Sequence, residues 1–306
     1  MARLNERQRA QIARNRAGAE GEALGRVISH QGYQLVVAVD EELLLADWRQ
    51  HLGDIVCNDR VRLSRSGDRA VIEALLPRGK SLHKWQGRGQ ARPLATNLDQ
   101  LLLVIAPEPA WQENLLERFL LAALAEDLPL ALLVNKCDLP RDDTAARLAA
   151  YPQLKIFWGS ASSGAGLAEL GAWLAGKQTL FCGQSGVGKS SLINYFQPEA
   201  AAWTQAISEL SRLGKHTTTN VRLYRAPGDT TLIDSPGMRG WHIQHYDEAL
   251  IHRAYADIGA LHCRFSDCGH GNEPGCAVRA ALADGRLSPQ RFANYQQLLA
   301  EKRRGR

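Results

Sequence analysis

Residues 181–192 read FCGQSGVGKSSL, an apolar stretch that runs through a glycine-rich turn into a helix-forming segment. The turn matches the phosphate-binding pattern G-x-x-x-x-G-K-[ST], in which backbone N–H groups and a helix N-terminus point at phosphate oxygens. We expect Lys189 to reach the β- and γ-phosphates and act in catalysis, and the Ser190 hydroxyl to ligate Mg²⁺. The stretch predicts an α/β nucleotide-binding domain whose phosphate contacts come from Gly183, Gln184, Ser185, Gly186, Val187, Gly188, Lys189, Ser190 and Ser191.

The motif Asn135-Lys136-Cys137-Asp138, of the form N-K-x-D, follows the apolar run at residues 128–134. We expect it at the carboxyl end of a buried strand, where open α/β sheets bind ligands. Asp138 can accept hydrogen bonds from guanine N1–H and the exocyclic amine, whereas adenine lacks this donor pair and would leave the carboxylate unpaired. Lys136 can lie along the base, and Asn135 can tie this loop to the phosphate loop. The motif therefore predicts preference for guanine.

Two further segments extend this site. Ser160-Ala161, within FWGSAS, resembles the backbone contact to guanine O6 that follows N-K-x-D in such proteins. Asp234-Ser-Pro-Gly237 fits D-x-x-G after a strand. Asp234 would hold Mg²⁺ through water, and the Gly237 N–H would meet the γ-phosphate. Together with the phosphate loop, these segments predict a site for GTP and Mg²⁺.

The segment LGKHTTTN, residues 213–220, carries three threonines, of which Thr218 or Thr219 would ligate Mg²⁺ when GTP is bound. The sequence does not choose between them. The residue after D-x-x-G is Met238, where many GTPases keep a glutamine that orients water, so intrinsic turnover should be slow. His216 is the nearest polar candidate for catalysis; the alternative is a loop histidine without a catalytic role.

A cluster of thiols and one imidazole lies near the C-terminus, formed by Cys263, Cys268, His270 and Cys276. Three cysteines and a histidine are a common closed set for structural Zn²⁺, with no open position for catalysis. Glycine and proline breaks suit a loop wrapped around a metal, while free structural thiols are the alternative. Nearby arginines could face RNA or water: Arg264, Arg279, Arg286 and Arg291.

The chain has 306 residues, 45% of them apolar and 23% charged, enough for two or three soluble domains. No apolar run is long enough to cross a bilayer, and the N-terminus lacks the apolar core of a secretory signal. We expect a cytoplasmic protein with no membrane partner. The net charge of +5 is concentrated at both ends, which either contact phosphate backbones or are solvated tails.

The hydrophobic pattern changes along the chain in a way that indicates a multidomain fold. After a basic arm (residues 1–20), five short alternating or apolar runs predict an OB-type β-barrel, followed by a basic linker at 78–93 without periodicity. Strands then alternate with helices, which predicts an α/β P-loop domain with a mostly parallel sheet. The end is mostly helical. We expect barrel and linker at 21–92, the P-loop GTPase domain at 93–242 and a zinc-binding helical domain at 243–306.

The motif order is reversed. N-K-x-D and Ser-Ala come before the phosphate loop, the threonines and D-x-x-G, so the usual set is circularly permuted. With GQSGVGKSSL, KHTTT, DSPGMRG and a Cys/His cluster ending in EPGC, this order resembles the RsgA (YjeQ) family of GTPases that depend on the small ribosomal subunit. The resemblance spans about residues 22 to 300.

The resemblance implies an OB barrel, a permuted GTPase domain and a C-terminal zinc domain with one structural Zn²⁺. It implies a GTPase that acts late in maturation of the bacterial 30S subunit, binds 16S rRNA, is stimulated by the subunit and is released when GTP becomes GDP. His216 matches a proposed catalytic histidine of the family, and we expect a monomer. Two alternatives remain: an RNA or protein scaffold with a vestigial nucleotide site, and a GTPase acting on another RNA such as tRNA.

Overall fold

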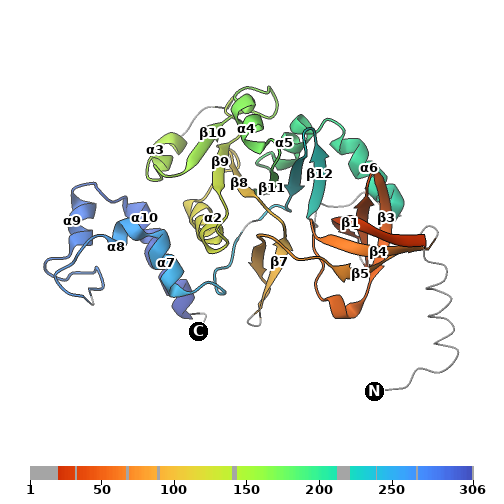
Figure 1. The fold of residues 1–306 in the computed structure, drawn as a ribbon. Helices are drawn as coiled ribbons and strands as arrows, with labels where there is room; N and C mark the ends of the chain where they lie inside the picture. The colour runs from red at the N-terminus through yellow and green to blue at the C-terminus, as the bar shows by residue number, and fades with distance from the viewer. Residues whose placement is uncertain are drawn as a thin grey trace, which may run out of the picture.

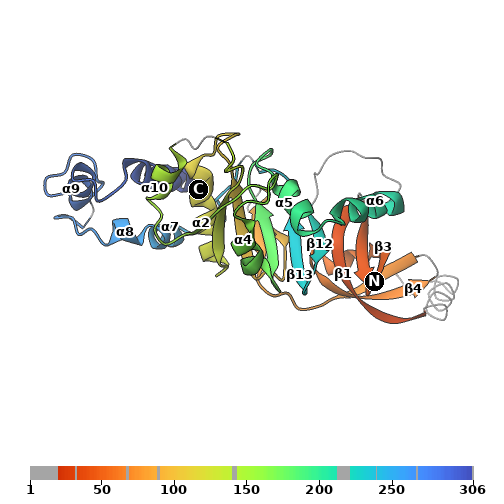
Figure 2. The ribbon, with the colours of Figure 1, turned by 90° about the horizontal axis from the view of Figure 1, so that it is seen from above.

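The computed structural model describes residues 20–31, 33–66, 69–87, 90–139, 143–211, 221–238, 240–266 and 268–304. His216, Thr218 and Thr219, and the basic arm up to residue 19, lie outside these ranges. The molecule is elongated, with the barrel at one end, the α/β unit in the middle and the C-terminal helices at the other end (Figures 1 and 2).

A mostly parallel sheet forms the centre of the α/β unit. Its strand order is β10-β9-β8-β11-β13-β12, with β12 antiparallel to β13. The central strands are continuous apolar runs because both of their faces are covered. The bounds are β8 (Gln100–Ile105), β9 (Leu130–Val134), β10 (Lys155–Trp158), β11 (Gln178–Cys182), β12 (Arg222–Ala226) and β13 (Thr230–Asp234).

Helices cover both faces of this sheet. Alternate residues of β8 decide the two layers: Leu101 and Leu103 pack with one apolar cluster, and Leu102 packs with the other. The first cluster includes α2 and α3, and the second includes α4 and α5. The bounds are α2 (Glu113–Ala125), α3 (Thr144–Leu148), α4 (Leu167–Leu174), α5 (Lys189–Phe196) and α6 (Ala200–Ser211).

The N-terminal unit is a closed five-stranded barrel with the order β1-β2-β3-β5-β4, closed by pairing of β1 with β4. This confirms the OB-type barrel predicted from five short runs. Strand β1 also pairs with β12 at Ser29 and Arg222, so the barrel continues the central sheet. The bounds are β1 (Glu20–Gln31), β2 (Gln34–Val39), β3 (Glu42–Trp48), the 3₁₀ turn η1 (Gln50–Leu52), β4 (Arg60–Ser66) and β5 (Arg69–Leu75).

The prediction of an irregular linker at residues 78–93 is wrong in one respect. The segment contains an antiparallel hairpin of β6 (Leu82–Trp85) and β7 (Ala91–Ala95). Leu82 and Ala95 are fully buried in the same cluster as α2. Strands of four and five residues are too short for a period to be recognised in the sequence.

The C-terminal unit consists of four helices and the loop that carries the Cys/His cluster. The Asp247 side chain caps α7 by accepting from the Leu250 N–H at 2.7 Å, and Pro289 begins α10, as a first helical residue often does. The bounds are α7 (Glu248–Ala254), α8 (Ala256–Gly259), α9 (Ala277–Ala283) and α10 (Pro289–Arg304). Among the described residues, no helix is both long and apolar enough to cross a membrane.

Candidate nucleotide site and metal centre

The phosphate loop joins β11 to α5, and its last glycine lies against the N-K-x-D loop. Gly188 has φ of 96°, and a Cβ there would lie 2.2 Å from Asn135 Nδ2. Only glycine allows both this backbone conformation and this close approach. The Asn135 amide donates to the Val187 carbonyl at 2.8 Å, and its oxygen accepts from the Ala161 N–H at 3.0 Å. One asparagine therefore connects three predicted nucleotide-binding loops.

Lys189 and Asp234 are charged groups buried at the bottom of this site. The Lys189 ammonium donates to the carbonyls of Gly183 at 3.0 Å and Gln184 at 2.8 Å. Burial lowers the pKa of Lys189, opposed by the charge of Asp234. Burial likewise raises the pKa of Asp234, opposed by Lys189. The site thus contains the buried ammonium of Lys189 and the buried carboxylate of Asp234 next to the loop that is expected to bind the phosphates.

Ser190 and Asp234 form a donor set that fits Mg²⁺. The Ser190 hydroxyl donates to Asp234 Oδ2 at 3.1 Å. The other carboxylate oxygen, Oδ1, is buried and has no hydrogen-bond partner among the described residues. A buried carboxylate oxygen without a partner costs free energy, and a hydrated cation would satisfy it.

The D-x-x-G loop packs directly on the phosphate loop. The Met238 N–H donates to the Gly183 carbonyl at 3.0 Å, and the Ser235 hydroxyl donates to the Phe181 carbonyl at 2.6 Å. A Cβ at Gly237 would lie 2.8 Å from the backbone of Ser185. A displacement of either loop would therefore displace the other.

The side chains predicted to hold the base lie on the adjacent strand ends. The pKa of Asp138 is lowered by a hydrogen bond from the Ser160 hydroxyl, so this exposed carboxylate is ready to accept from a base. The Cys137 N–H donates to the Gly159 carbonyl at 3.1 Å, which fixes one loop on the other. Lys136 stands with its ammonium 2.7 Å from the carbonyl of Glu108.

The loop after β8 is part of the site, although no sequence motif indicates it. The Glu108 carbonyl holds Lys136, and the Pro109 ring lies against Gly186 of the phosphate loop. Strand β8 lies between β9 and β11, so the loop at its carboxyl end must enter the space between the base loop and the phosphate loop. The position of this loop depends on the order of the strands in the sheet, and that order cannot be read from the sequence.

The Cys/His cluster assembles around a common point between α8 and α9. Cys263 Sγ lies 3.8 Å from Cys276 Sγ and 3.5 Å from His270 Nδ1, and Cys276 Sγ lies 3.6 Å from His270 Nδ1. The four donor atoms, with that of Cys268, all lie within 4.8 Å of one another. Tetrahedral zinc with Zn–S of about 2.3 Å and Zn–N of about 2.05 Å requires edges of about 3.8 and 3.6 Å. The donor set therefore fits Zn²⁺.

The arginines around this cluster do not behave alike. Arg264, Arg279 and Arg286 are exposed, which fits either of the two alternatives, solvent or RNA. Arg291 is buried, and its guanidinium donates to Glu117 and Asp257. The expectation that Arg291 faces RNA or water is wrong, because the buried carboxylate of Glu117 on α2 and the half-exposed carboxylate of Asp257 on α8 replace its solvation.

Comparisons with known proteins agree with this architecture. A model of the family described as RsgA GTPase matches residues 75–244. The protein named small ribosomal subunit biogenesis GTPase RsgA from Dichelobacter nodosus is 43% identical and covers 99% of both chains. Its namesake from Azotobacter vinelandii is 40% identical, covering 98% of this chain and 92% of its own.

Two solved structures share the fold. YjeQ from Thermotoga maritima superposes with a TM-score of 0.66 at 28% identity, covering 92% of this chain and 99% of that one. YloQ, a circularly permuted GTPase, superposes with a TM-score of 0.63 at 23% identity, covering 100% and 99%. The fold of this chain is therefore one that a circularly permuted GTPase also has.

Proposed function

The chain belongs to the RsgA GTPase family, and from this premise we propose that it hydrolyses GTP during late maturation of the bacterial 30S ribosomal subunit. One observation carries the nucleotide part of the proposal. Loops that are far apart in sequence, and that hold Asn135, Lys189 and Asp234, meet at the carboxyl ends of β9, β11 and β13. A vestigial site would have no reason to retain all three side chains.

The proposed mechanism uses charges that are already in place. Lys189, now bonded to two loop carbonyls, would turn its ammonium to the β- and γ-phosphates of GTP. Ser190 and Asp234 would hold Mg²⁺, with Thr218 or Thr219 joining them. When bound, Mg²⁺ neutralises charge on the phosphates. The Gly237 N–H would donate to the γ-phosphate, and His216 would orient the attacking water.

The base specificity is assigned to Asp138, held by Ser160. We expect Asp138→Asn to weaken GTP binding and to gain xanthosine triphosphate, because the amide can donate to the C2 carbonyl of xanthine. Isothermal titration with the two nucleotides measures this exchange. Asp229→Asn, in the exposed turn between β12 and β13, is the matched control and should leave both affinities unchanged. Unchanged GTP affinity in Asp138→Asn would remove this residue from the site.

The metal at the Cys/His cluster is proposed to be one structural Zn²⁺ held by Cys263, Cys268, His270 and Cys276. The sulfur of Cys276 also accepts the Arg279 N–H at 3.4 Å at the start of α9, so metal binding and helix formation are linked. We expect metal analysis to find one zinc per chain, and none in Cys268→Ser. Cys137→Ser, outside the cluster, should retain it. Retention of zinc in both variants would contradict this ligand set.

The partner proposal is the 30S subunit with its 16S rRNA, contacted by a monomeric, cytoplasmic protein. We propose functional units at residues 21–92, 93–242 and 243–306, with the basic arm of residues 1–20 adding phosphate contacts. GTP hydrolysis is to be measured alone and with purified 30S, 50S or tRNA at physiological salt. Stimulation by 30S alone, lost in Lys189→Ala, supports the proposal. Stimulation by tRNA, or by nothing, rejects the 30S partner.

A further inference from the structure

The segment that follows the D-x-x-G loop contacts three parts of the molecule, and we name residues 241–246 the relay segment. Trp241 is buried with its ring 5.1 Å from that of Phe119 on α2. His245 stacks on Trp85 of β6, with ring centroids 6.1 Å apart. Gln244 is bonded to α10. A displacement of the D-x-x-G loop would therefore reach the hairpin, α2 and α10 through this one segment.

Arg118 of α2 joins the relay segment to α10. Its Nη1 donates to the Trp241 carbonyl at 2.6 Å and to Glu301 Oε1 at 3.1 Å, and its Nη2 donates to Glu301 Oε2. The planar guanidinium fork makes these bonds at fixed angles, which a lysine cannot do. Because one side chain holds a backbone carbonyl and a helix side chain together, the positions of Trp241 and Glu301 are coupled.

The C-terminal end of α10 is bonded to the relay segment a second time. Glu301 Oε1 also accepts from the Gln244 amide at 3.1 Å, and Lys302 donates to the Gln244 carbonyl at 2.7 Å. These contacts hold the C-terminal end of α10 against the relay segment. It moves with the relay segment as long as Arg118 and Glu301 hold the two together.

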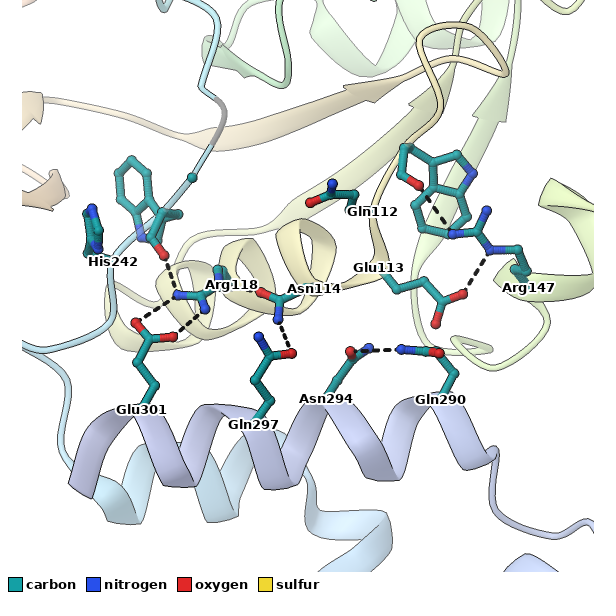
Figure 3. Close-up of a pocket in the computed structure, with 13 residues that line it drawn as sticks. Gln112, Glu113, Asn114, Arg118, Arg147, His242, Gln290, Asn294, Gln297 and Glu301 are labelled. Carbon is teal, nitrogen blue, oxygen red and sulfur yellow. Dashed lines mark hydrogen bonds and ion pairs between the residues drawn. The ribbon is translucent and has the colours of Figure 1, made fainter. Parts of the chain in front are cut away.

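A polar cavity of about 750 Å³ lies between α2, α3 and one side of α10 (Figure 3), where the Asn114 amide of α2 donates to Gln297 of α10 at 2.7 Å. The opposite side of α10 packs on α2, where Arg291 donates to Glu117 at 3.1 Å. The lining of the cavity includes five carboxamide side chains: Gln112, Asn114, Gln290, Asn294 and Gln297. The buried amide nitrogen of Asn294 has no partner among the described residues. A polar, loosely packed gap resists sliding less than a close-packed apolar interface does. On this side, α10 is held to α2 by hydrogen bonds of single side chains rather than by close packing, so a change in the contacts of Arg118 can alter the position of this end of α10.

We propose that Arg118 is a positioning residue that transmits the state of the nucleotide from the D-x-x-G loop to α10. The inference rests on the GTPase function proposed above. Contacts are described on both sides of residue 239: Met238 is bonded to the phosphate loop, and Arg118 links Trp241, three residues further along the chain, to Glu301. In the GTP-bound and GDP-bound states, the contacts of Arg118 with Trp241 and Glu301 would differ, and with them the position of the C-terminal end of α10.

The cavity offers a matched control. At its other end, Arg147 of α3 donates to Glu113 at 2.8 Å, and this pair has no bond to the relay segment among the contacts described (Figure 3). Arg147→Ala removes an arginine–glutamate pair from the edge of the same cavity. It tests whether loss of any ion pair here has the same effect as loss of the one at Arg118.

The experiment is hydrogen exchange of the full-length protein with GDP and with a non-hydrolysable GTP analogue. In the wild type and in Arg147→Ala, exchange of α10 should differ several-fold between the two nucleotides. In Arg118→Ala this difference should vanish, while the phosphate loop still responds, and Arg118→Lys should restore only part of it. With 30S, Arg118→Ala should lower the stimulated kcat about tenfold, with basal rate and KM unchanged.

The outcomes are separable. A nucleotide response of α10 that persists in Arg118→Ala, or that vanishes equally in Arg147→Ala, overturns the role of Arg118. So does a wild-type α10 that does not respond to the nucleotide. Because the exchange experiment contains no ribosome, absence of 30S stimulation rejects only the partner. If Arg118→Ala does not fold, Glu301→Gln, which keeps the side-chain shape and loses the charge, carries the same expectation.

Discussion

The α/β unit is joined to the barrel and to the C-terminal helices by different kinds of contact. At the barrel, strands β1 and β12 pair within one sheet, and Arg26 of β1 donates to Thr231 of β13 at 3.1 Å and to Gln178 of β11. At the other end, apolar residues of α7 and α10 pack on α2, and the described polar contacts between α2 and α10 come from side chains: the ion pairs of Arg118 and Arg291 and the hydrogen bond from Asn114 to Gln297. Backbone pairing fixes relative position, whereas side-chain pairs at helices allow re-orientation. We therefore expect the barrel to move with the α/β unit, and the C-terminal helices to be the part that shifts.

The largest effect is expected at the buried ion pair of the C-terminal junction. Arg291 lies 3.1 Å from Glu117 Oε1 and 2.8 Å from Asp257, with its guanidinium 4.5 Å from the Tyr255 ring centre. Arg291→Met leaves Glu117 buried without its cation and should cost about 3–5 kcal/mol. Urea-dependent hydrogen exchange should show α10 opening at lower urea, with β11 unchanged.

The double variant Arg291→Met with Glu117→Leu is the control for this experiment. It removes both buried charges and should recover much of the loss, because a buried pair replaced by apolar residues is often neutral. If β11 opens together with α10 in Arg291→Met, the two junctions are equally rigid and the comparison fails.

A smaller effect is expected at the barrel junction. Arg26 is half-buried, and its loss would leave polar partners such as Gln178 and Thr231 with one bond fewer. Arg26→Met should cost about 1–3 kcal/mol. Exchange in β2 and in β11 should rise together, with α10 unaffected. Arg60→Met, on the exposed side of β4, should change neither. Separate opening of β2 would show that the continuous sheet does not act as one body.

The sequence predicted those parts of the molecule in which particular residue types are needed at fixed spacing. The phosphate loop, N-K-x-D and D-x-x-G depend on glycines and charged groups that no other residues replace, and the barrel on five alternating runs. The burial of Arg291 was not predictable, because its partner Glu117 is 174 residues away. The Glu108 loop was missed since its place depends on strand order. The hairpin of β6 and β7 was missed since its strands are too short for a period.

The smallest effect is expected from a titrating pair between the β6–β7 hairpin and α2. His83 of β6 lies 2.7 Å from Glu126 at the end of α2, and this hydrogen bond raises the pKa of His83, opposed by burial and by Arg78. Because the folded-state pKa is above the unfolded value of about 6.5, the stabilisation is complete below that value. It is lost as the pH rises through the folded-state pKa.

The pair is partly exposed, so its contribution should stay below about 1 kcal/mol. The difference in unfolding free energy between wild type and Glu126→Gln should be present at pH 6 and vanish by about pH 9, above the raised pKa of His83. Exchange in the β6–β7 hairpin reports it. The arginine–carboxylate pairs at the C-terminal junction keep their charges over this range, so α10 should not respond to the same pH change. An equal pH response of α10 and of the hairpin would contradict this. It would mean that the relay segment couples the hairpin and the C-terminal junction more tightly than their separate contacts imply.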